Sequence, residues 1–136
     1  GQLAGMNFTL LYLYENLFSG RFSLSSSFFQ NILYLDLSQN SFTGPLPWRE
    51  DVYSRFITWY QSTSNFFDGT FPNSALTPNL RYYLLGDNLM SGSLPSHFLS
   101  NSTSLYYLAI SQNYFFGPVP DSIGDLRQLN QVFMDV

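Results

Sequence analysis

The stretch Leu35-Asp-Leu-Ser-Gln-Asn40-Ser-Phe42-Thr-Gly44-Pro-Leu46-Pro47 decides the fold of this chain. It has the form of a short strand carrying Leu35, followed by a tight turn of the pattern Asn-x-Phe-x-Gly-x-Leu-Pro. Related stretches occupy residues 12–22, 65–72, 88–95 and 113–120, and their asparagines are 24, 25, 23 and 25 residues apart. Asn-x-apolar-x-Gly arises by chance at about one position in a thousand. Five matches in near-constant register therefore indicate an internal repeat.

A repeat of this length with one strand each predicts a solenoid, in which every repeat forms one rung and contacts only its neighbours. Strand positions five and three before each asparagine should face the core, because side chains alternate along a strand. Apolar residues eight before and two after the asparagine add two further core columns. The expected core residues are Leu11, Leu13, Leu35, Leu37, Tyr60, Ser62, Tyr83, Leu85, Leu108, Ile110, Val132 and Met134 in the strands, with Phe8, Ile32, Ile57, Leu80, Leu105, Leu129, Phe18, Phe42, Phe67, Met90 and Phe115 outside them.

Three further columns have structural roles. The asparagine amide can satisfy backbone groups where the chain turns out of the strand, with the bond repeated in the next rung. The glycine column suits a turn that needs positive φ, and the proline column ends local pairing by removing a donor. The structural asparagines are Asn16, Asn40, Asn65, Asn88 and Asn113.

These repeats resemble the plant-type leucine-rich repeats of receptor-like kinases, receptor-like proteins and polygalacturonase-inhibiting proteins. The motifs Gly44-Pro-Leu46-Pro47 and Gly117-Pro-Val119-Pro120 carry the resemblance, which covers the whole chain. It implies a horseshoe of the α/β class with about five and a half repeats, a parallel sheet on the concave face and short 3-10 or irregular turns on the convex face. The chain departs from the pattern where Phe and Tyr replace Leu, and in the poor third strand at 56–64. We expect the third rung, residues 53–72, to bulge by one residue.

We interpret residues 1–136 as one leucine-rich repeat array and as an internal piece of a longer solenoid, with neighbouring repeats or chains at both open ends. Paired cysteines close plant-type arrays, whereas this chain has no Cys. A complete cysteine-free domain is the alternative. The parallel sheet should pair 35–37, 83–85 and 108–110 in order, and Asp121 or Ser122 could cap a short helical turn.

Composition excludes several function classes. The net charge is −4 with five Arg and no Lys, which argues against a nucleic-acid partner. No apolar run approaches the length of a membrane span, so no membrane contact is expected within this segment. His97 is the single histidine, and Glu50 and Asp51 have no third ligand nearby, so we expect no metal, no cofactor and no enzyme activity.

Outward-facing strand positions alternate with the core positions and should line the concave face. Six before the asparagine, this column holds four consecutive aromatic residues. These rings could stack only on one another, or they could form a platform for a protein, peptide or carbohydrate ligand, since Tyr and Trp are common binding anchors. The candidate ligand-binding residues are Tyr12, Tyr14, Tyr34, Asp36, Trp59, Gln61, Tyr82 and Tyr107.

Two Asn-x-Ser/Thr sequons begin at Asn7 and Asn101 and predict N-glycosylation, more strongly at Asn101, which lies in a polar insertion. With the family resemblance they favour an extracellular or cell-surface location. Two functions remain open. One is a recognition module that binds through the concave face. The other is a structural protein that assembles into a wall, sheath or filament, which low charge and abundant aromatic residues also fit.

Overall fold

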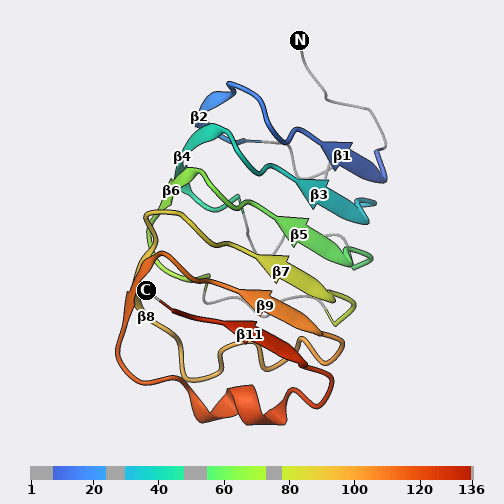
Figure 1. The fold of residues 1–136 in the computed structure, drawn as a ribbon. Coiled ribbons are helices and arrows are strands. Elements are labelled where there is room, and N and C mark those ends of the chain that lie inside the picture. The colour runs from blue at the N-terminus through green and yellow to red at the C-terminus, as the bar shows by residue number, and fades with distance from the viewer. Residues whose placement is uncertain (1–7, 24–29, 48–54, 73–77, 136) are drawn as a thin grey trace.

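The computed structural model describes residues 8–23, 30–47, 55–72 and 78–135. Every rung contributes one three-residue strand to a six-stranded parallel sheet, here called the main sheet (Figure 1). Its strands are, in spatial order, β1 (Leu10–Tyr12), β3 (Tyr34–Asp36), β5 (Trp59–Gln61), β7 (Tyr82–Leu84), β9 (Tyr107–Ala109) and β11 (Gln131–Phe133). The predicted parallel sheet is confirmed, with each strand beginning one residue earlier than expected.

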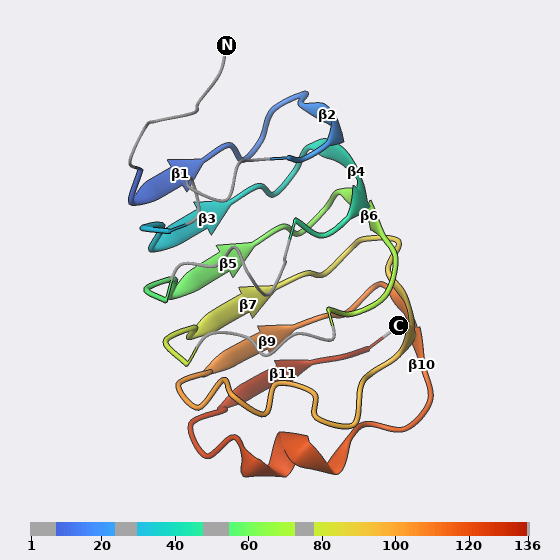
Figure 2. The same cartoon turned by 180° about the vertical axis from the view of Figure 1, so that it is seen from behind.

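The turns that follow the asparagines also form parallel strands, which the sequence pattern did not predict. Figures 1 and 2 show them stacked along one side of the molecule. β2 (Ser19–Arg21), β4 (Ser41–Pro45) and β6 (Phe66–Asp68) form one sheet, and β8 (Ser91–Ser93) pairs with β10 (Tyr114–Phe116) in another. β4, β6, β8 and β10 end before the proline column of the repeat (Pro47, Pro72, Pro95 and Pro120), although β4 includes Pro45. The glycines in these turns have φ between 79° and 96°, which confirms the predicted positive φ.

The core lies between the two sets of strands and follows the predicted columns. In the inner rungs, Leu35, Tyr83 and Leu108 are fully buried, as are Ile32, Leu80 and Leu105 in the column that precedes the strands. Phe42 stacks on Phe67 of the next rung with ring centroids 6.1 Å apart. The core is therefore a series of like residues packed one above another along the solenoid.

The first and last rungs depart from the predicted core. Phe18 is 46% exposed and Val132 is 39% exposed, while Leu11, Leu13 and Met134 are only partly buried. Phe8, Leu129 and Phe115 are also partly buried. The reason is that a residue in a solenoid is covered by the rungs on both of its sides, and these rungs have a described neighbour on one side only.

The third rung is regular in its strand, although its sequence is the poorest match. Trp59, Tyr60 and Gln61 pair in register with β3 on one side and with β7 on the other. Tyr60 and Ser62 are buried as the repeat predicts. The expected bulge is therefore absent from β5, because burial of Tyr60 fixes the register of a strand whose side chains alternate.

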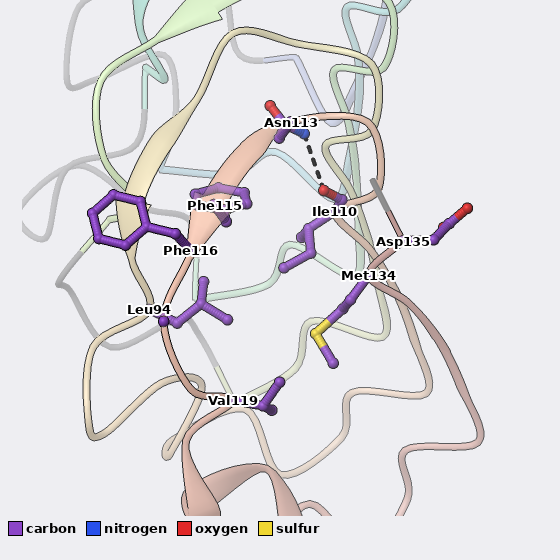
Figure 3. Close-up of a pocket in the computed structure, with 9 residues that line it drawn as sticks. Leu94, Ile110, Asn113, Phe115, Phe116, Val119, Met134 and Asp135 are labelled. Atoms are coloured by element: carbon purple, nitrogen blue, oxygen red, sulfur yellow. Dashed lines mark hydrogen bonds between the residues drawn. The ribbon is translucent and has the colours of Figure 1, made fainter.

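The asparagine column is buried and hydrogen-bonded from Asn40 onward, as predicted. The amide of Asn88 donates to the carbonyl oxygens of Leu85 and Gly86 in its own rung and of Ser62 in the preceding rung, at 3.1, 3.2 and 3.0 Å. Its Oδ1 accepts the backbone N–H of Phe67 at 3.0 Å. Asn40, Asn65 and Asn113 repeat this arrangement, and Figure 3 shows the bond from Asn113 to the Ile110 carbonyl.

Asn16 corrects that prediction in part. It donates to the carbonyl oxygens of Leu13 and Tyr14, yet its side chain is exposed, since it belongs to the first described rung.

The prediction that Asp121 or Ser122 caps a helical turn is wrong. The 3-10 helix η1 (Asp121–Asp125) begins after Pro120 without a side-chain cap, and the Ser122 hydroxyl donates instead to the carbonyl of Phe98 at 3.0 Å.

Candidate ligand-binding face of the main sheet

Aromatic rings form a continuous series across the outward face of the main sheet. We call it the aromatic ladder. Its members, from the first rung to the last, are Tyr12, Tyr34, Trp59, Tyr82, Tyr107 and Phe133. Successive ring centroids in this order are 5.4, 4.9, 4.4, 6.2 and 5.4 Å apart.

Strand register produces this ladder. Tyr34, Trp59, Tyr82 and Tyr107 occupy directly paired positions on β3, β5, β7 and β9, so the sheet itself sets their spacing. The Tyr34 and Trp59 ring planes differ by 13°, which is a stacked pair. All four of these side chains are half-buried, with the rest of each ring open to solvent. Trp59 therefore faces outward and Tyr60 inward, as predicted.

The two ends of the ladder come from a different column. Tyr12 and Phe133 lie four residues before their expected asparagine positions, two places further along their strands than the other members. They are 50% and 45% exposed and close diagonally onto Tyr34 and Tyr107. Sequence reasoning missed Phe133 as a site residue, although its column was available from the repeat. Tyr14 is 52% exposed but is not a member of the ladder.

Polar groups beside the ladder are already engaged within the protein. Asp36 accepts the backbone N–H of Ser38 at 2.9 Å through one carboxylate oxygen, and the Ser38 hydroxyl bonds to the same oxygen. Trp59 Nε1 donates to Gln61 Oε1 at 3.3 Å. These bonds hold the predicted site residues Asp36 and Gln61 against the sheet. A ligand would meet mainly the outer edges of the rings, because the ring faces are turned toward neighbouring rings, with the second carboxylate oxygen of Asp36 beside them.

Tyr34 keeps its proton across the neutral range. Burial raises the pKa of its phenol above the ordinary value, and nearby Tyr12, Asp36 and Tyr82 raise it further. A protonated phenol can donate a hydrogen bond as well as accept one. The centre of the ladder therefore combines apolar ring surface with phenol hydroxyls that can form hydrogen bonds with the backbone of a ligand.

A cavity of about 100 Å³ lies below the fifth rung and is lined by apolar side chains that include Leu94, Phe115 and Met134 (Figure 3). Asp135 supplies a carboxylate at its wall. Between inner rungs, the corresponding space next to Phe42 is filled by Phe67 of the following rung. We therefore interpret this cavity as the space that a side chain of the next rung fills elsewhere in the solenoid, and not as a ligand site. Within the described ranges, no group of His, Cys, Asp and Glu is placed to hold a metal ion.

The two glycosylation predictions have different outcomes. Asn101 lies in an exposed turn after Leu99, which has a φ of 61°. Its surroundings leave room for a glycan, and the modification stays a prediction. Asn7 lies outside the described residues. His97 is exposed and lies 3.3 Å from the Ser96 hydroxyl through Nδ1.

Comparison with known proteins agrees with this architecture. Residues 31–49, which contain the stretch from Leu35 to Pro47, match the family model described as Leucine Rich Repeat. The chain belongs to the leucine-rich repeat family. Receptor-like protein 41 and Receptor-like protein 39 of Arabidopsis thaliana are 33% and 36% identical over 92% of the chain. The chain spans only 14% of the length of each.

A solved plant structure shares the same coil. The peptide hormone receptor RGFR1, in complex with RGF2, superposes with a TM-score of 0.82 and 29% identity over 93% of this leucine-rich repeat chain. The match covers 20% of that receptor chain. In the part of the present chain that the structure describes, no helix is long and apolar enough to cross a membrane.

Proposed function

We propose that this leucine-rich repeat array is a non-catalytic recognition module that acts outside the cell and binds an extended peptide along the aromatic ladder. The ladder is the observation that carries the proposal. Partly exposed rings on six successive strands form a continuous aromatic surface, and such surfaces are typical of binding sites. Relatedness to plant receptor-like proteins, and to a receptor solved with its peptide hormone, supports the same class of function.

The dimensions of the ladder suit a short extended peptide. Neighbouring strands are about 4.8 Å apart, so six strands span about 24 Å. An extended chain rises about 3.4 Å per residue, so about seven residues would cover the ladder. Such a peptide would cross the strands and place alternate side chains over the rings, while tyrosine hydroxyls such as that of Tyr34 meet its backbone groups.

Charge favours a ligand that is neutral or basic. The chain carries a net charge of −4, and Asp36 lies beside the Tyr34 ring, with which it interacts electrostatically. Both the negative net charge and the Asp36 carboxylate attract a basic side chain to this face. We therefore expect peptides with aromatic, proline or arginine side chains to bind better than acidic ones.

The test uses peptides selected from a display library of random seven-residue sequences, because such a peptide matches the length of the ladder. Trp59→Ala should weaken the best binder by roughly 2 kcal/mol, or about 30-fold, because Trp59 is central and hot spots lie at the centre of an interface. Phe66→Ala is the matched control, since Phe66 is an aromatic residue 49% exposed on β6, away from the main sheet. Fluorescence anisotropy would give both affinities.

A second result would separate binding from mutual stacking of the rings. If the rings serve only one another, Trp59→Ala lowers the free energy of unfolding and leaves the affinity of the peptide unchanged. That outcome, or equal losses for Trp59→Ala and Phe66→Ala, would contradict the proposal.

A further inference from the structure

The two sides of the main sheet on which its strands begin and end carry opposite charge. We call the side where the strands begin the basic edge and the side where they end, together with the second set of strands, the acidic edge. Arg55, Arg81 and Arg127 are exposed on the edge where the chain enters the strands. At the other edge the chain passes to the second set of strands (Figures 1 and 2). Exposed acidic residues lie just after the strands of the main sheet or at the end of β6. These acidic residues are Asp68, Asp87 and Asp135.

The two sets of charges lie in the same rungs. Arg55 and Asp68 belong to the third rung, and Arg81 and Asp87 to the fourth, while Arg127 and Asp135 flank β11. Other described charges lie outside this pattern, except for Glu15, which adds to the acidic edge. Asp36 is on the sheet face and Asp121 and Asp125 are on η1, whereas Arg21, at the end of β2, lies on the acidic edge in the first rung. The basic edge therefore presents one sign and the other edge is mainly acidic, with opposite charges at matching heights in the third, fourth and sixth rungs.

Grooves with exposed apolar side chains accompany both sets of charges. On the basic edge, Leu33 and Phe56 are 39% and 54% exposed, and with Arg81 they line a groove of about 510 Å³. On the acidic edge, Leu89 and Tyr114 are 44% and 65% exposed, and with Asp87 they line a groove of about 330 Å³. The two edges thus have the same make-up, an apolar groove with a charge, and opposite sign.

The repeat itself does not explain the apolar side chains on the acidic edge. The position after the asparagine is a variable one in the repeat pattern, and its side chain points away from the core. It is nevertheless apolar in four of the five rungs, as Leu17, Phe66, Leu89 and Tyr114. These side chains are between 44% and 95% exposed, so they contribute little to folding. Their apolar character is accounted for if another surface covers them.

We propose that copies of this chain associate side by side, with the basic edge of one copy against the acidic edge of the next and with their rungs in register. Both edges follow the strand spacing of about 4.8 Å. A single displacement therefore brings Arg55, Arg81 and Arg127 level with Asp68, Asp87 and Asp135 of the neighbouring copy. The contact joins two different surfaces, so it leaves one edge of each kind open and extends into rows. The aromatic ladder takes no part in it.

The test measures association of the chain by sedimentation velocity over a range of concentrations. At low salt the mean mass should rise with concentration beyond that of a dimer, and added salt should reduce it, because ions screen exposed charges. The variant with Arg55→Glu and Arg81→Glu should associate with an apparent Kd at least roughly tenfold higher, since like charges then face each other. Asp68→Arg with Asp87→Arg should have the same effect.

Mixing the two double variants provides the decisive measurement. Each variant alone presents two edges of one sign. In the mixture, every edge meets an edge of opposite sign, so association should return to near the level of the unaltered chain. Asp121→Arg with Asp125→Arg is the control for a change of charge away from both edges, because both residues are exposed on η1, and it should leave association at low salt close to that of the unaltered chain. Trp59→Ala should also leave association unchanged.

Circular dichroism and thermal unfolding check that each variant is folded. If the arginine variants do not fold, Asp68→Asn with Asp87→Asn removes the same charges at nearly constant size and should weaken association and its salt dependence. A chain that stays monomeric at low salt would overturn the proposal. So would a mass that stops at a dimer, or a mixture that associates no better than its components.

Discussion

The buried asparagine solves the problem that the turn after each strand creates. At that point the chain leaves the main sheet, and backbone groups lose their strand partners inside the molecule. Asn88 replaces those partners with three donated bonds and one accepted bond, shared between its own rung and the preceding one. A side chain with both donors and an acceptor is required, which explains why an amide rather than a carboxylate occupies the column.

Asn88→Ala should lower the free energy of unfolding by about 1–3 kcal/mol, because it leaves buried backbone groups without partners. Asn16→Ala is a matched control, since the Asn16 side chain donates to carbonyl oxygens of its own rung and is exposed. Asn16→Ala should lower the free energy of unfolding by clearly less, because water can replace the hydrogen bonds of the exposed Asn16 side chain. Urea unfolding followed by circular dichroism measures both. A loss of only a few tenths of a kcal/mol for Asn88→Ala would mean that the column is not required for stability.

The strands of the main sheet, their register and the aromatic ladder were largely predictable from sequence, because a repeat multiplies each weak pattern by the number of rungs. The second set of strands was not, since these strands are only three to five residues long and β2, β4 and β8 contain the turn glycine, which is unfavourable in a strand. Residues just before the asparagines show the same limit. In five rungs this residue has a φ of 54° to 56°, a left-handed conformation that glycine favours. The residues are Glu15, Gln39, Ser64, Asp87 and Gln112, and their types do not predict this conformation.

The boundaries of the core were also beyond the sequence pattern. A column predicts which way a side chain points, whereas burial depends on whether another rung covers it. Phe18 and Phe42 occupy the same column, and only Phe42 is buried. For the ladder, the columns gave the inner four rings, but the diagonal contacts of Tyr12 and Phe133 depend on the twist of the sheet.

The turn glycines set how closely neighbouring rungs approach. Gly92 has a φ of 96°, and a Cβ added there would lie 3.2 Å from Thr70 Cγ2. Gly20 has a φ of 79°, with open space around the same position. Gly20→Ala should therefore cost about 1–2 kcal/mol for the left-handed backbone alone. Gly92→Ala should cost more, because Thr70 must also move.

Thermal and urea unfolding of the two glycine variants would measure this difference. Gly124→Ala is the control, because its added Cβ meets open space and its backbone has no positive φ. It should change stability little. Equal losses for Gly20→Ala and Gly92→Ala would show that backbone conformation matters here and rung spacing does not.

Across the whole molecule, aromatic residues serve two separate purposes. Rings on the outward face of the main sheet remain partly open, while Tyr60 and Tyr83 directly beneath them are buried and lie edge to face with centroids 5.5 Å apart. Adjacent strand positions therefore place one tyrosine in the proposed binding face and the next in the core. This division links ligand recognition to the same strand register that stabilises the fold.

The buried tyrosines make the stability of the whole chain sensitive to alkaline pH. Burial raises the pKa of Tyr60 and Tyr83 above the ordinary value of 10.0, and each phenol keeps its proton in the folded state. Above about pH 10 the unfolded chain loses these protons while the folded chain retains them, so the free energy of unfolding falls as pH rises. Below that pH both states are protonated and this contribution is fully present.

Tyr83→Phe should therefore reduce the slope of stability against pH above about pH 10 by up to about 1.4 kcal/mol per pH unit, the value for one proton. Tyr114→Phe is the control, because it removes a phenol that is 65% exposed rather than buried. Urea unfolding from about pH 8 to about pH 11 measures the slopes. Tyr83→Phe could shift the whole curve by altering the core, so only the slope decides. The same slope in Tyr83→Phe and in the unaltered chain would mean that the folded state opens before the phenol ionises.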